Sequence, residues 1–165
     1  MKHQRGLVLF ELITVIVLVG IIGIFATFFL YSSINGYLKT KNTSEGAMDA
    51  QMALDRISLE LRHLSYFTSS PVTSGNASLS YQSEVLGGNR MLKYDSVNDT
   101  MTINISGTDY LLLEDVTSFN LSVTADDLNL DGVNDVASIG VGFYLHGIGK
   151  EFKTTIFPRH MVKNK

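Results

Sequence analysis

The chain of 165 residues has no cysteine and only two prolines, Pro71 and Pro158. Without cysteine, no disulfide can hold the fold together. Charged residues are also scarce, at 18%, against 45% hydrophobic residues. The apolar residues are concentrated before residue 32. This distribution predicts an apolar N-terminal segment followed by one domain with a modest core.

Motifs that mark common enzymes are also missing. The four histidines show no metal-ligand spacing, and no G-x-S-x-G is present. The stretch Gly147–Lys150 fails as a phosphate-binding loop because Tyr144 stands where the first glycine is required. With a net charge of −3 and only scattered basic residues in the tail, no nucleic-acid-binding patch is evident. We therefore expect neither an enzyme nor a nucleic-acid partner.

The apolar segment runs from Leu7 to Tyr31, and apart from the Tyr31 phenol its only ionisable group is Glu11. As a helix it would be roughly 37 Å long, enough for a hydrocarbon core of about 30 Å. Lys2, His3 and Arg5 precede it without an acid. The positive-inside rule then places the N-terminus in the cytoplasm. A carboxylate in such a helix is costly and calls for a partner or a function.

These residues carry a family resemblance. Basic residues, Gly6, the hydrophobic Leu7, Glu11 five places after the glycine, and an Ile/Val/Leu run containing Gly20 resemble the leader and membrane helix of type IV pilins and type II secretion pseudopilins. The resemblance implies cleavage between Gly6 and Leu7 by a prepilin peptidase, methylation of the new Leu7 amine, and assembly into a fibre. It also implies that Glu11 pairs with the terminal ammonium of a neighbouring subunit.

Departures from that family pattern indicate a minor subunit. Leu7 stands where most members have Phe, Val8 where Thr is frequent, and Phe28 where many major pilins have proline. The phrases LDRISLELRHL, LLEDVTSFNLSV and FKTTIFPRH are similar to those of J-type minor pseudopilins and related minor pilins. The alternative reading is an uncleaved signal anchor in which the glutamate occurs by chance.

The predicted fold is α+β, with a long N-terminal helix packed on a C-terminal antiparallel β-sheet. We expect a leader at 1–6, a transmembrane and assembly helix at 7–34, and an extracytoplasmic domain at 35–165. In that domain an amphipathic helix continues to about residue 67, and β-structure begins at about residue 79.

Periodicity supports both parts of this domain. An apolar helical face is expected at three- and four-residue spacing, comprising Ala47, Ala50, Leu54, Ile57, Leu61 and Leu64, with the polar residues Asp49, Arg56, Glu60 and His63 on other faces. Strands are expected at 90–94, 101–105, 119–123, 139–145 and 152–156.

A calcium site is predicted between two of these strands. Asp127, Asn129, Asp131 and Asp135 occupy positions 1, 3, 5 and 9 of an EF-hand-like loop, with Gly132 at position 6 and the Val133 carbonyl at position 7. Ser138 replaces the bidentate glutamate of position 12, which would weaken affinity. A plain Asp/Asn/Gly turn is the alternative.

Together these features predict a minor pilin or pseudopilin of a type IV pilus or type II secretion system. It would have no cofactor except a structural calcium ion, and its partners would be other pilin subunits, the peptidase and the inner membrane. The domain would be periplasmic, and the subunit would enter a fibre on assembly. The alternative is a monomeric membrane-anchored periplasmic module that binds calcium or another ligand.

Overall fold

A computed structural model describes residues 4–73, 75–130, 132–159 and 162. This part of the chain forms one helix, α1 (Gln4–Arg62), followed by β-strands. By its internal contacts the chain divides between Ser44 and Glu45 into two units.

The first unit is the N-terminal part of α1. No proline interrupts it, and each described side chain from Leu9 to Ser44 is exposed. Its apolar part is long enough to cross a membrane, and none of its most apolar window is buried within the chain. A helix that is apolar all round must be surrounded by lipid or by other protein. Among the described residues, none buries a side chain of this half of α1 between Leu9 and Ser44.

The second unit contains two antiparallel sheets. Sheet A has the order β1 (Tyr66–Phe67), β2 (Ser78–Gln82), β3 (Asn89–Asp95), β4 (Thr100–Ile105) and β5 (Thr108–Leu113). Sheet B has the order β6 (Val116–Asp126), β7 (Asp135–Leu145) and β8 (Ile148–Ile156). Consecutive strands pair throughout both sheets, so short turns suffice to connect them.

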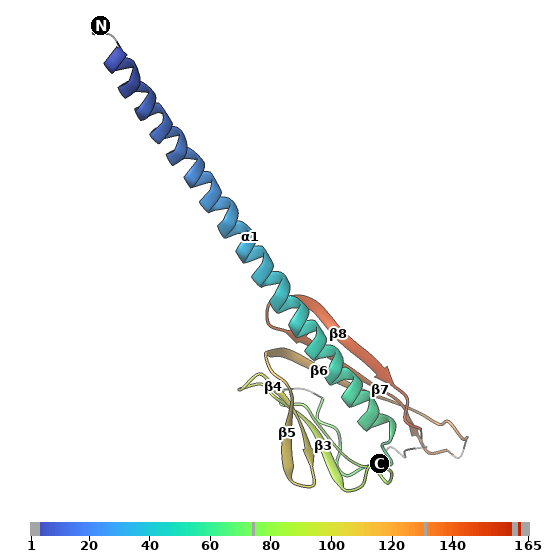
Figure 1. The fold of residues 1–165 in the computed structure, drawn as a ribbon. Helices are drawn as coiled ribbons and strands as arrows, with labels where there is room; N and C mark the ends of the chain where they lie inside the picture. Colours follow the sequence, from blue (N-terminus) through green and yellow to red (C-terminus); the bar gives the residue numbers. More distant parts are fainter. Residues whose placement is uncertain (1–3, 74, 131, 160–161, 163–165) are drawn as a thin grey trace. The chain divides into compact units, whose positions relative to one another are not determined.

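The core lies where the second half of α1 packs on both sheets (Figure 1). Of the predicted apolar face of the helix, five residues are buried: Ala50, Leu54, Ile57, Leu61 and Leu64. They meet inward-facing residues such as Leu79, Leu92, Val141 and Phe143. Each large apolar side chain buried in this way contributes about 1.5–3 kcal/mol. The α+β architecture predicted from the sequence is thus confirmed, with the strands divided into two sheets.

One expected boundary was wrong, and one strand was missed. The helix ends at Arg62 rather than near residue 67, because Ser65 N–H already donates to Gln82 O at 2.9 Å and the short strand β1 pairs with β2. Strand β5 was not predicted at all. It lies at the edge of sheet A, where Tyr110 and Leu111 are exposed, so its side chains do not alternate.

Candidate functional site

The apolar half of α1 carries one carboxylate, Glu11. The two threonines of this apolar half form hydrogen bonds within the helix. Thr14 Oγ1 donates to Phe10 O and Thr27 Oγ1 donates to Gly23 O, each at 2.9 Å. Such back-bonding lets a hydroxyl sit in an apolar environment without an external partner. Among the residues that the structure describes, none forms a hydrogen bond or an ion pair with Glu11. In lipid, the Glu11 carboxylate would require an opposite charge from another molecule.

Gly6 and Leu7, the residues on either side of the predicted cleavage position, lie within the span of α1. Their role in processing stays a prediction.

Glu60, in the second half of α1, lies in a buried polar cluster that the periodicity argument missed. It is 1% exposed. Arg90 Nη1 donates to its two carboxylate oxygens at 2.9 and 2.8 Å, and the exposed Arg56 reaches it at 2.6 Å. The Tyr81 hydroxyl donates to it at 3.2 Å. The cluster joins the helix to β2 and β3 of sheet A.

The electrostatics of this cluster keep the tyrosine protonated. Burial is the main cause that raises the pKa of Tyr81, and the adjacent Glu60 carboxylate raises it further. The phenol therefore remains a hydrogen-bond donor. Placing Glu60 away from the apolar face of the helix was wrong, since it is 1% exposed. A sequence signal existed, because Glu60 stands three residues after Ile57 and four before Leu64, on the buried face. We read the cluster as a structural anchor, because all of its groups satisfy one another.

The acidic loop between β6 and β7 contains the residues of the predicted calcium site. Gly132 N–H donates to Asp127 Oδ2 at 2.9 Å, which folds the loop back on its first acidic residue. Gly132 and Leu130 both have positive φ, 81° and 59°, so the backbone turns sharply here. Asp135 is 0% exposed, and neither of its carboxylate oxygens has a hydrogen-bond partner.

Asn129 and Val133 lie in the same connection and each makes an interaction. Asp131 lies outside the described residues. Within the described part of the chain, no three His, Cys, Asp or Glu side chains converge as a metal group. A site here would thus depend on amide, carbonyl and water oxygens in addition to carboxylates.

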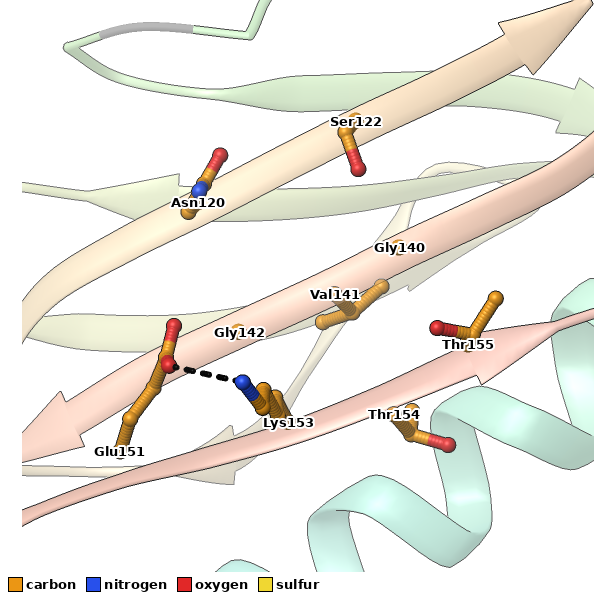
Figure 2. A pocket seen from close by; sticks show the side chains of 9 residues that line it. All are labelled: Asn120, Ser122, Gly140, Val141, Gly142, Glu151, Lys153, Thr154 and Thr155. Carbon is orange, nitrogen blue, oxygen red and sulfur yellow. Dashed lines mark ion pairs between the residues drawn. The ribbon is translucent and has the colours of Figure 1, made fainter.

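A shallow hollow of about 390 Å³ lies on the outer face of sheet B. Figure 2 shows Asn120 and Ser122 along one strand, Gly140 and Gly142 along the next, and an ion pair between Glu151 and Lys153 on the third. Gly140 and Gly142 form the floor of the hollow. The side chain of Ser122 on β6 lies next to Gly140, and that of Glu151 on β8 lies next to Gly142. Its lining is what a solvated sheet face normally presents. It brings together no nucleophile and base that would indicate catalysis.

No family model, curated protein or solved structure matches the chain.

Proposed function

We propose that the chain is a minor pilin or pseudopilin, cleaved between Gly6 and Leu7 and assembled through its N-terminal helix into a type IV pilus or type II secretion pseudopilus. The observation that carries the proposal is an apolar helix, exposed along its whole first half, that holds a single carboxylate without a partner in the described chain.

Physical chemistry supports assembly rather than simple anchoring. An anchor needs only apolar residues, and a glutamate costs it about 2.5–3.5 kcal/mol at the bilayer centre, less near the end. In a fibre, the new amine of a neighbouring subunit supplies the opposite charge. Two groups that would each be costly in lipid then neutralise one another, and their pairing fixes the axial register between subunits.

The arrangement of the second unit also suits a fibre. The helix face turned toward the sheets is buried, while Met48, Met52 and Leu59 on α1 are 63%, 61% and 47% exposed. They continue an apolar surface along the helix that a neighbouring subunit would cover. The competing function is a monomeric membrane-anchored module, which would leave this surface and Glu11 unpaired.

Crosslinking distinguishes the two functions. Because the chain has no cysteine, one introduced cysteine reports a single position. In cells that contain the assembly system, Ile16→Cys should form crosslinks to other small pilin-like subunits. Tyr110→Cys, on the edge strand β5, is the comparison for random encounter. A chain that stays monomeric at both positions would contradict assembly and favour the anchored module.

A further inference from the structure

Among the described residues the two sheets have four edge strands, β1, β5, β6 and β8, and three of them carry a feature that keeps another strand from adding to them. β1 has only two residues, and β8 contains Lys150 and Lys153. The free edge of β6 is covered where the strand begins, since Val116 N–H donates to Asp99 O at 2.9 Å and Val116 O accepts the Tyr94 hydroxyl at 3.0 Å. Short length, lysine and coverage are common protections of a sheet edge.

Strand β5 is the edge strand without these protections. Its sequence, Thr108–Leu113, contains neither lysine nor proline, and among the described strands it pairs with β4 alone. The register shift of that pair lies between Leu111 and Leu113, so residues 108–111 pair regularly. Tyr110 and Leu111 are 52% and 55% exposed. Because successive residues of a strand point to opposite faces, this edge offers apolar surface on both sides.

The turn between β4 and β5 determines which backbone groups of β5 point outward. Both residues of the turn at 106–107 have positive φ, 52° and 94°, as a type I′ hairpin turn requires. Such a turn closes on a hydrogen-bonded pair, here Ile105 and Thr108. Hydrogen-bonded and non-hydrogen-bonded pairs alternate in antiparallel strands. The N–H and C=O groups of Asp109 and Leu111 therefore point away from β4, toward the position of a further strand.

Charge indicates what kind of chain fits this edge. Asp109 lies in β5, Glu114 and Asp115 follow it, and residues 108–115 contain no base. All three acids are exposed. Asn104 Nδ2 donates to Asp109 at 2.6 Å, but this neutral donor leaves the negative charge in place. Pairing β5 with β5 of a second copy would bring like charges together, which is unfavourable. The complementary chain has basic residues on both sides of an apolar run.

We propose that β5 is a docking edge for an extended segment of another protein, in which basic residues flank a short apolar run. The segment would add to sheet A beyond β5 (Figure 1), with backbone hydrogen bonds to Asp109 and Leu111. Its apolar side chains would cover Tyr110 and Leu111. Its basic residues would lie near Asp109 and Glu114, which are about 17 Å apart along an extended chain. The inference does not rest on fibre assembly, because every residue that carries it lies in the second unit.

The test follows hydrogen exchange by NMR, which resolves single amides, in the full chain held in a mild non-ionic detergent. The probe is a short capped peptide in which two lysines flank alternating valine and threonine. Saturating peptide should slow exchange of the Asp109 and Leu111 amides several-fold and leave the Tyr110 amide, which already faces β4, unchanged. High salt should weaken the binding, because it screens exposed charges. The same peptide with glutamates in place of the lysines should protect neither amide.

Three variants locate the binding on β5. Leu111→Lys gives β5 the protection that β8 has, and should reduce the affinity for the lysine peptide at least tenfold. Asp109→Asn keeps an acceptor for Asn104 and should weaken binding several-fold. Val97→Lys is the matched control, an apolar residue that is 83% exposed outside β5, and should bind as the parent chain does.

Several results would overturn the proposal. One is a parent chain whose Asp109 and Leu111 amides gain no protection from the lysine peptide. Equal protection by the glutamate peptide, or unchanged binding in Leu111→Lys, would do the same. Protection of these two amides that increases with protein concentration in the absence of peptide would identify a second copy of the chain as the occupant, and would also contradict the proposal.

Discussion

Replacing Arg90 by methionine should expose how much the domain depends on the buried Glu60 cluster. Arg90 is 8% exposed and supplies two of the hydrogen bonds to Glu60, and it also donates to Gly87 O at 3.2 Å and Leu86 O at 3.1 Å. Methionine fills a similar volume without charge. The variant therefore leaves a carboxylate that is 1% exposed without its main partner.

The expected cost is about 3 kcal/mol, the lower end of the range for breaking a buried ion pair. The lower end applies because Tyr81 and Arg56 still contact Glu60. Arg56→Met is the matched control. Its side chain is 45% exposed, so solvent screens the pair and its loss should cost about 1 kcal/mol or less.

Urea unfolding of a fragment from residue 35 onward measures these values, since the core cluster begins at Ala50 and lies wholly within that fragment. The double variant Glu60→Gln/Arg90→Met removes both charges and keeps an acceptor for Tyr81. It should recover about 1–2 kcal/mol relative to Arg90→Met alone. The reasoning is refuted if Arg90→Met costs less than about 1 kcal/mol, or if the double variant is the less stable of the two.

Three further outcomes are expected. Gly6→Val should block cleavage and leave the leader attached, which an immunoblot would show as a larger chain; normal maturation would contradict the assignment. Glu11→Val should insert and mature but enter the fibre several-fold less, because the Leu7 amine of a neighbour is left unpaired in lipid; wild-type incorporation would exclude the pairing. Hydrogen bonds, chiefly from the Asn98 side chain, lower the pKa of Asp95, so this carboxylate stabilises the fold above its unfolded-state pKa and the contribution is lost as pH falls through the folded value. Asn98→Ala should make the stability less sensitive to pH in that acidic window, as measured by urea unfolding; an unchanged pH profile would show that this turn does not contribute.

Local patterning was sufficient to predict the α+β architecture and most of the elements. The three-and-four spacing from Ala50 to Leu64 identified the buried face of α1, and the alternation in 139–145 identified β7. These signals are local, because burial of one face imposes its period directly on the sequence.

Features that depend on distant partners were not predictable in the same way. The spacing of Glu60 from Ile57 and Leu64 fits the buried face of α1, but a charge at that place is accounted for only once Arg90, thirty positions along the chain, is known to pair with it. Strand β5 is an edge strand without alternation, so only its pairing with β4 defines it. The end of α1 depends on Gln82, because the Gln82 carbonyl accepts a hydrogen bond from Ser65 N–H and so holds Ser65 beside the sheet. In the acidic loop, the sequence suggested the ligand spacing, but the burial of Asp135 became apparent only from the fold.

The mass of the mature chain tests the central claim most directly. Intact-mass spectrometry of protein purified from cells that contain a prepilin peptidase should give the mass of residues 7–165 plus one methyl group, located on the Leu7 amine by fragmentation. That result would establish processing as a pilin-like subunit. A chain that still begins at Met1, or one cleaved beyond the apolar segment, would contradict it.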